Sequence, residues 1–129
     1  MKKIIALFSV MCVAGSAMAF SASIFGKWQY TVEQNGFKST LSMNIEEAKT
    51  AFGVKCELNG EVLEASVDVP TKVEGDKFII GGTAQKTAGK IGDIDCNLNV
   101  SPESLTFTVT DGELVIVREE GNTTYTRVQ

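Results

Sequence analysis

The 129-residue sequence contains no histidine. The side chains that could take part in catalysis or metal binding are therefore its carboxylates, its cysteines and one row of alternating polar residues. Histidine is the side chain most used for acid–base work and metal binding near neutral pH. Its absence excludes Ser-His-Asp, Cys-His and histidine–metal catalysis. Paired carboxylates could still supply acid–base chemistry. The candidate carboxylates fall on polar strand faces or in turns: Glu33, Glu46, Glu57, Glu64, Asp93 and Asp95. A solvated outer wall accounts for them, so we expect no catalytic residue and no enzyme.

The polar row consists of Asp93, Asp95, Asn97 and Asn99, whose oxygen atoms are of the kind that calcium prefers. The row lies on a predicted strand, where alternate side chains stand about 7 Å apart along the chain. One ion cannot gather ligands with that spacing, and calcium loops turn tightly around a glycine. We expect no metal site and no cofactor.

The first 19 residues have the pattern of a cleaved secretory signal peptide. Lys2 and Lys3 precede an apolar run, and Ala17 and Ala19 place small residues before a cut after Ala19. The apolar run is shorter than the roughly 20 residues that a permanent membrane helix needs. We therefore predict a periplasmic or secreted protein whose mature domain is residues 20–129, with no stable membrane span after cleavage.

Cleavage changes both the charge and the cysteine count. Without Lys2 and Lys3, ten basic side chains face 16 acidic ones, and the net charge falls from −4 to −6. An acidic surface disfavours nucleic acid as a partner and suits either a basic protein target or solubility alone.

Cys56 and Cys96 remain in the mature chain, and two cysteines in an exported protein favour one disulfide. The bridge would stabilise the fold by roughly 4 kcal/mol through loop closure. A redox or metal role is the alternative, but the sequence has no Cys-x-x-Cys motif. Both cysteines alternate with polar residues, so we expect the bridge on the inner side of the fold.

Apolar and polar residues alternate with period two over most of the mature chain, which is typical of half-buried strands. Turn signals such as Asn35-Gly36, Asn59-Gly60 and Asp111-Gly112 separate these segments. The residues on the apolar faces include Trp28, Tyr30, Leu41, Met43, Phe52, Val54, Leu63, Val67, Phe78, Leu105, Phe107, Leu114 and Ile116. The pattern predicts an all-β protein, an antiparallel up-and-down barrel of about eight to ten strands.

Three segments carry further expectations. Asp93–Val100 is the clearest predicted strand, and Glu46–Ala51 is the one segment that could form a helical turn. Gly81–Gly92 contains four glycines and breaks the alternation. It is either a flexible loop at a barrel mouth or a twisted hairpin end with glycine bulges.

The two ends of the domain resemble lipocalins and fatty-acid-binding proteins. Gly26-Lys27-Trp28 resembles the Gly-x-Trp start of these barrels, and Thr123-Thr124-Tyr125-Thr126-Arg127 resembles their last strand, in which an arginine stands near the terminus. The resemblance implies a lipocalin-like barrel in which Arg127 stacks on Trp28 at the closed end, a contact worth up to about 2 kcal/mol. The fatty-acid-binding branch holds a carboxylate with an arginine and a tyrosine two residues later, where this chain has Gln129.

A barrel of about eight strands either fills its interior or holds one small ligand. The candidate lining residues share the apolar faces: Tyr30, Met43, Phe78, Phe107 and Ile116. Arg118 has the same parity as Leu114 and Ile116, so it either points inward toward an anionic group or emerges into solvent near the strand end. We predict a non-enzymatic binding protein with a small apolar or amphipathic ligand.

Two other functions fit the size, charge and compartment. One is an inhibitor of a lysozyme or a protease, for which the acidic charge would attract a basic target. The other is a structural or stress-related periplasmic module. A carrier requires an internal cavity of some hundreds of Å³, whereas an inhibitor requires a packed interior and an exposed apolar patch.

Overall fold

The computed structural model describes residues 23–128. The predicted signal peptide (residues 1–19), its cleavage site after Ala19, and Gln129 lie outside these residues. Within 23–128 there is no helix with the length and hydrophobicity needed to cross a membrane.

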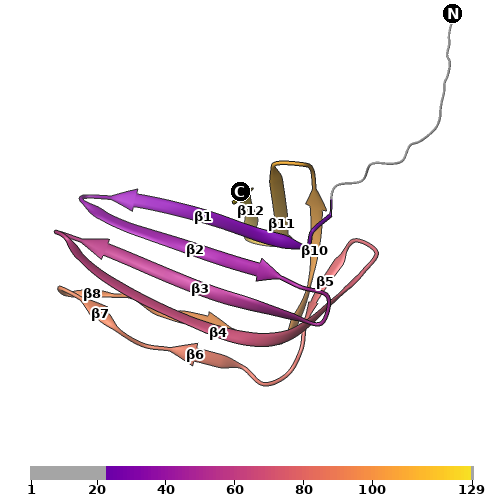
Figure 1. Cartoon of the computed structure of the whole chain (residues 1–129), viewed down its shortest axis with the longest axis horizontal. Helices are drawn as coiled ribbons and strands as arrows, with labels where there is room; N and C mark the ends of the chain where they lie inside the picture. Colours follow the sequence, from indigo (N-terminus) through magenta and orange to yellow (C-terminus); the bar gives the residue numbers. More distant parts are fainter. Residues whose placement is uncertain (1–22, 129) are drawn as a thin grey trace, which may run out of the picture.

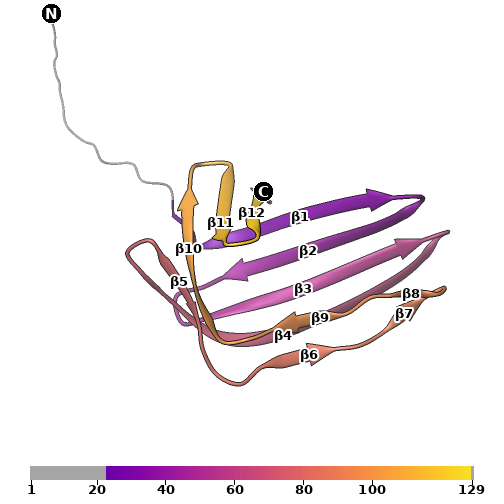
Figure 2. The ribbon, with the colours of Figure 1, turned by 180° about the vertical axis from the view of Figure 1, so that it is seen from behind.

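Eight strands close into an antiparallel barrel in the order β1-β2-β3-β4-β5-β10-β11-β12, with β12 pairing back to β1. The predicted all-β barrel is thus confirmed. β1–β4 run along the long dimension of the molecule, whereas the shorter β10–β12 lie at one end of it (Figures 1 and 2). The barrel strands are β1 (Gly26–Gln34), β2 (Phe37–Ile45), β3 (Lys49–Leu58), β4 (Glu61–Glu74), β5 (Lys77–Ile80), β10 (Glu103–Val109), β11 (Glu113–Arg118) and β12 (Gly121–Arg127).

Tight turns set the register of the long strands. Asn35 and Asn59 adopt φ values of 52° and 51°, and the glycines that follow them also have positive φ. Two successive positive-φ residues give the turn that matches the twist of a hairpin. The turns pair Gln34 with Phe37 and Leu58 with Glu61, which keeps the apolar positions of β1–β4 on one face.

Trp28 plugs the end of the barrel at which β1 meets β12. Its side chain is fully buried, and its Nε1–H donates a hydrogen bond of 2.8 Å to the carbonyl oxygen of Ile24. The guanidinium carbon of Arg127 lies 4.2 Å from the centroid of the Trp28 ring. This is the contact that the family resemblance implied, and it stacks a cation on the indole face.

Arg127 also binds three backbone carbonyl groups from two segments of the chain beside Trp28. Its guanidinium donates to the carbonyl oxygens of Ser23, Phe25 and Asp111 at 2.7, 3.2 and 2.9 Å, respectively. Gly26 permits this arrangement because it has a φ of 129° and a Cβ atom there would lie 2.8 Å from Arg127 Nη1. The glycine of the Gly-x-Trp start is therefore required by both its backbone conformation and its neighbour.

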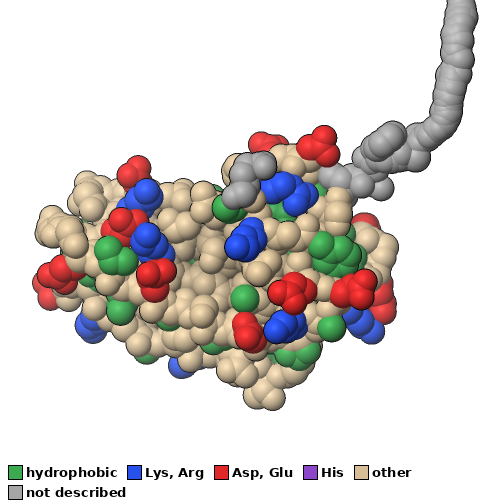
Figure 3. Space-filling model, in the orientation of Figure 1, with side chains coloured by type: hydrophobic (Ala, Val, Ile, Leu, Met, Phe, Trp, Pro, Cys, Tyr) green, Lys and Arg blue, Asp and Glu red, His purple; other side chains and the backbone are tan. Residues whose placement is uncertain are grey.

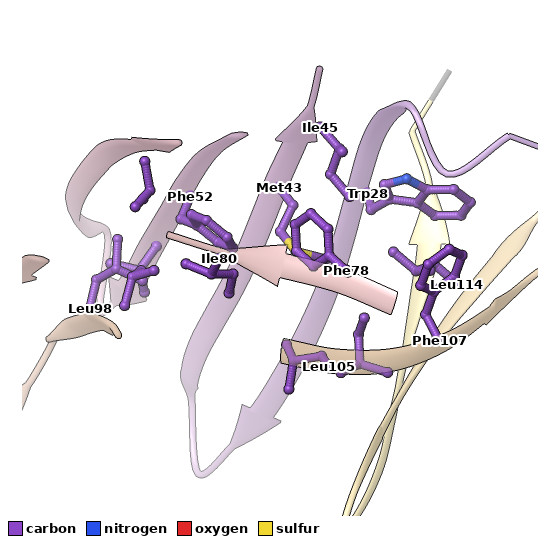
Figure 4. Close-up of a cluster of buried hydrophobic side chains, with 14 of the residues drawn as sticks. Trp28, Met43, Ile45, Phe52, Phe78, Ile80, Leu98, Leu105, Phe107 and Leu114 are labelled. Carbon is purple, nitrogen blue, oxygen red and sulfur yellow. The ribbon is translucent and has the colours of Figure 1, made fainter. Parts of the chain in front are cut away.

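The core follows the inward faces of the barrel strands. In Figure 4, Trp28, Phe107 and Leu114 lie toward one end of the buried cluster, and Phe52 and Leu98 lie toward the other. The Phe52 and Phe78 rings are 6.4 Å apart, within the usual range for interacting aromatic rings.

Between β5 and β10 the chain leaves the barrel and forms a hairpin, residues 81–100, which we call the arm. It contains β6 (Gln85–Thr87), β7 (Lys90–Ile91), β8 (Ile94–Asp95) and β9 (Leu98–Val100), with β6 paired to β9 and β7 to β8. The Gly81–Gly92 segment is thus the first half of a hairpin and contains β6 and β7.

The arm covers the inner face of β3 and β4 where these strands extend beyond the shorter ones. Gly89 approaches Leu63 and Gly92 approaches Leu58 so closely that added Cβ atoms would lie 2.8 and 3.0 Å from the leucine methyl groups. The predicted disulfide is confirmed: Cys56 on β3 is bonded to Cys96 in the arm, and both are buried. The bridge therefore attaches the arm to the inner side of the barrel.

Two local predictions are wrong. Glu46–Ala51 is no helical turn: it is a short connection from β2 into β3, in which the Glu46 N–H donates to the Lys49 carbonyl oxygen at 2.8 Å. Asp93–Val100 is not one strand, because the chain leaves regular structure at Cys96 and Asn97, between β8 and β9. The Cys96 N–H instead donates across the arm to the Gly89 carbonyl oxygen at 2.8 Å.

Two buried hydroxyl groups form a hydrogen bond inside the barrel, and its contribution to stability can be tested. Thr50 and Thr71 are 0% and 5% exposed, and their hydroxyl oxygens are 2.7 Å apart. Thr50→Val should lower the free energy of unfolding by about 1–3 kcal/mol because it leaves the Thr71 hydroxyl buried without its partner. The Thr50→Val/Thr71→Val double variant should recover most of that loss. Urea denaturation checks this; a double variant less stable than the single would contradict it.

Candidate functional site

A partly open cavity of about 320 Å³, with both apolar and polar lining residues, lies inside the barrel, where β2, β3, β5, β10, β11 and β12 face the arm. Barrel strands provide most of its wall and the arm provides the rest, through residues 97–100. The lining residues are Leu41, Ser42, Met43, Phe52, Gly53, Phe78, Ile80, Asn97, Leu98, Asn99, Val100, Glu103, Leu105, Ile116, Arg118 and Tyr125. A cavity of this size is at the lower end of the range for small-molecule sites.

The cavity grades from a buried apolar interior to a polar mouth. Phe78 is fully buried, and Ile116 and Met43 are 3% and 5% exposed. Arg118 and Glu103 are both exposed, and each side chain keeps 38% of its surface in contact with solvent. A molecule with an apolar body and a polar end fits this gradient better than a wholly apolar or a wholly polar one.

Arg118 and Glu103 form an ion pair at the mouth. Arg118 Nη1 donates to both Glu103 carboxylate oxygens, at 3.2 and 3.4 Å. Among the described lining residues, Arg118 is the sole cation and Glu103 the sole anion. The pair is exposed, so it contributes little to stability.

Tyr125 adds a second polar group to the wall. Burial raises the pKa of its hydroxyl, Arg118 nearby opposes that rise, and the Tyr30 hydroxyl adds slightly to it. The Tyr125 phenol is therefore protonated at neutral pH and can donate a hydrogen bond. Its ring packs against that of Tyr30, with 5.9 Å between centroids.

The predicted ligand residues separate into two groups. Met43, Phe78, Ile116 and Arg118 line the cavity together. Tyr30 is outside the lining set and is 36% exposed. Phe107 is buried near Trp28 and Leu114 (Figure 4) and is also outside the lining set.

Sequence reasoning missed Glu103, Tyr125 and arm residues 97–100. It also did not name six other lining residues as ligand candidates: Leu41, Ser42, Phe52, Gly53, Ile80 and Leu105. Glu103 has the parity of Leu105 and Phe107, and Tyr125 has the parity of Arg127, so alternation could have placed both on the inner face. Asn97 and Asn99 carry no such signal, because their approach to the cavity depends on how the arm folds back.

Two residues of the polar row Asp93, Asp95, Asn97 and Asn99 make contacts within the arm. Asn97 Oδ1 accepts a hydrogen bond from the Gly89 N–H at 3.1 Å, and Asp95 lies 3.5 Å from Lys90 Nζ. In the described part of the chain, no group of three or more cysteine, aspartate or glutamate side chains could hold a metal ion.

Gly26, Trp28 and Arg127, the residues on which the expected resemblance to lipocalins and fatty-acid-binding proteins is based, lie together at one end of the barrel and do not line the cavity. The ligand site must therefore be judged from its own residues. Comparison of the chain with protein families, curated proteins and solved structures finds no match.

Proposed function

We propose that this protein is an exported, non-enzymatic carrier that holds one small apolar or amphipathic molecule inside its barrel. The observation that supports it most is the 320 Å³ cavity, which has an apolar interior and a polar mouth. Monomeric proteins usually pack their interiors as densely as organic crystals. The enclosed position of this cavity and its buried apolar side chains, more than its volume, support a binding site, and burial of an alkyl chain there would contribute about 0.8 kcal/mol per methylene.

The cysteine pair supports the proposed location. A structural disulfide persists in the periplasm or outside the cell and is rare in the cytosol. Cys56–Cys96 also fixes one wall of the cavity, since the arm that it attaches contributes residues 97–100. The same disulfide therefore supports both proposals: it is typical of a periplasmic or secreted protein, and it holds in place the arm that forms part of the cavity wall.

The inhibitor alternative has weaker support. Its expected signature is a packed interior together with a large exposed apolar patch. The face in Figure 3 instead carries interspersed acidic and basic side chains with scattered apolar ones. The acidic net charge would still steer a basic protein partner toward the molecule.

A cavity-filling substitution tests the carrier proposal. Leu41 lines the cavity and is only half-buried, so Leu41→Trp adds volume there without disrupting the deepest core. We expect it to weaken binding of the neutral fluorescent probe N-phenylnaphthylamine by at least about tenfold. Lys38→Trp, at an exposed position on the same strand, should leave the affinity unchanged. Saturable fluorescence titration measures both.

Native mass spectrometry of protein purified from the periplasm provides an independent measurement, since a retained ligand adds directly to the mass. The carrier proposal fails if the wild type binds the probe without saturation, or if Leu41→Trp and Lys38→Trp bind it equally well.

A further inference from the structure

We infer that two copies of this protein associate through the second half of β1, as antiparallel strands related by a two-fold axis at Val32. This part of β1 does not line the cavity, so the inference goes beyond the proposed carrier function and does not depend on it. The register of β1, the exposure of its residues and the charges along each free strand edge support it.

β1 loses one of its two neighbouring strands half-way along its length. It pairs with β2 from Gly26 to Gln34, but with β12 only at Trp28 and Gln29. In the described part of the chain, residues 30–34 therefore have no paired strand on the side away from β2. All five are exposed, and Figures 1 and 2 show this half of β1 extending past β10–β12. Such an edge is a template for pairing with another chain.

The backbone groups of Thr31 and Glu33 face this free edge. The Lys27 carbonyl oxygen accepts a hydrogen bond from the Val128 N–H at 2.9 Å, so Lys27 faces β12. Successive residues of an antiparallel strand point their backbone groups to alternate sides. Thr31 and Glu33 therefore face the same side as Lys27, and within residues 23–128 no strand pairs with them there.

Two other barrel strands have free edges, but acidic side chains protect them against self-pairing. Residues 61–69 of β4 pair with β3 alone, and Glu61, Glu64 and Asp68 lie among them. The start of β12 pairs with β11 alone and directly follows two glutamates. Charges and prolines are the usual protection of a strand edge. The free edge of β1 contains one acidic residue and no proline, so it is the least protected of the three.

A second copy fits the free edge of β1 in one symmetric register. With Val32 opposite Val32 of the second copy, Thr31 of each copy lies opposite Glu33 of the other, and about four backbone hydrogen bonds form. An axis at Glu33 would place two carboxylates opposite each other, which is unfavourable. An axis at Thr31 would require Gln29, whose edge already pairs with Thr126.

The side chains on both faces suit the register centred on Val32. On the inner face, Tyr30 and Val32 are 36% and 43% exposed, and the pairing brings the two valines together. On the outer face, Glu33 already lies beside Lys38 of β2 and would gain a threonine as its new neighbour. A two-fold pairing occupies the free edges of both copies and stops at a dimer. Because the shared edge is short, we expect the dimer to be weak and reversible.

Sedimentation equilibrium tests the pairing. Thr31→Pro removes the N–H that faces the free edge and leaves the ladder to β2 complete, a placement that edge strands tolerate. It should weaken dimerisation at least about tenfold, because the symmetric pair loses two hydrogen bonds. Thr31→Ala is the matched control, since it also loses the hydroxyl contact to Thr40 but keeps the N–H, and it should dimerise like the wild type. The acidic net charge opposes association, so wild-type affinity should rise with ionic strength.

A cysteine at the axis tests the register without relying on the proline variant. Opposite residues in a non-hydrogen-bonded pair have Cα atoms about 4.5 Å apart, which a disulfide can span. Val32→Cys should therefore form a covalent dimer on oxidation. Val62→Cys, at a position on β4 that is 53% exposed, is the control and should stay monomeric.

The inference is overturned if the wild type is monomeric at about 1 mM, if Thr31→Pro dimerises as strongly as the wild type, or if the two cysteine variants cross-link equally. Assemblies that grow beyond a dimer would overturn it in favour of β1 pairing with a different edge. A monomer that retains a stoichiometric peptide would overturn it in favour of another chain on this edge. Titration of the same samples with N-phenylnaphthylamine reports on the carrier function separately.

Discussion

Replacing Trp28 with alanine is expected to lower the free energy of unfolding by about 3–5 kcal/mol, the range for deleting a large buried aromatic side chain. The indole is completely buried, donates a hydrogen bond to Ile24 and carries the Arg127 guanidinium on its face. The substitution would leave a cavity at the plugged end and would remove the surface on which Arg127 stacks. Denaturant unfolding followed by circular dichroism measures the loss.

Two control variants separate the plug from general damage to β1. Gln29→Ala changes an exposed neighbour on the opposite face of the strand and should shift stability by less than about 0.5 kcal/mol. Trp28→Phe retains an aromatic face for Arg127 but loses the indole N–H, so it should fall between alanine and the wild type. A Trp28→Ala loss below about 1 kcal/mol would show that this residue does not plug the barrel.

Removing the disulfide should have an effect of similar size, concentrated in the arm. Cys56→Ala/Cys96→Ala is expected to lower the free energy of unfolding by roughly 4 kcal/mol through the entropy of the unfolded chain. Alanine is preferred to serine because both positions are buried, and a hydroxyl at either would need a partner.

The arm should respond to this substitution more than the barrel does. Among the described residues, its backbone bond to the barrel is Gly81 N–H to the Pro70 carbonyl oxygen, at 2.9 Å. The remaining attachment is the disulfide and the apolar contacts of Ile91, Leu98 and Val100. Hydrogen exchange in residues 85–100 should therefore accelerate beyond that in β1–β4, and N-phenylnaphthylamine should dissociate faster. A uniform change across all strands would contradict this role for the bridge.

Period-two alternation is sufficient to predict the barrel because each strand buries one face and each tight turn joins neighbours in sequence. It is insufficient for the arm. Leu98 and Val100 alternate with asparagines as they would in a barrel strand, yet they pair with Thr87 and Gln85 outside the barrel ladder. That choice depends on tertiary packing against β3 and β4, which local pattern does not encode.

The candidate site is predictable to the extent that parity determines it. Parity assigns six candidates to inward faces; Met43, Phe78, Ile116 and Arg118 line the cavity, whereas Tyr30 and Phe107 do not. The pairing of Arg118 with Glu103 needs the register of the hairpin as well as parity: β10 and β11 pair antiparallel with Thr106 opposite Val117, which brings the start of β10 beside the end of β11. Alternation identifies the inner face, but it does not say which inner residues border empty space.

The pairing of β1 with β12 has a consequence for the order of folding. Most ladders of the barrel join strands that are consecutive in sequence, whereas this one joins Trp28 to Arg127, near the two ends of the described chain. Contacts between distant residues carry the larger loop-closure entropy and form late in a folding reaction. We infer that the hairpins form first and that β1 pairs with β12 afterwards; we call this β1–β12 pairing the seam. The Trp28 indole would then stay hydrated through most of the folding reaction. Weakening the seam would then speed unfolding more than it slows folding.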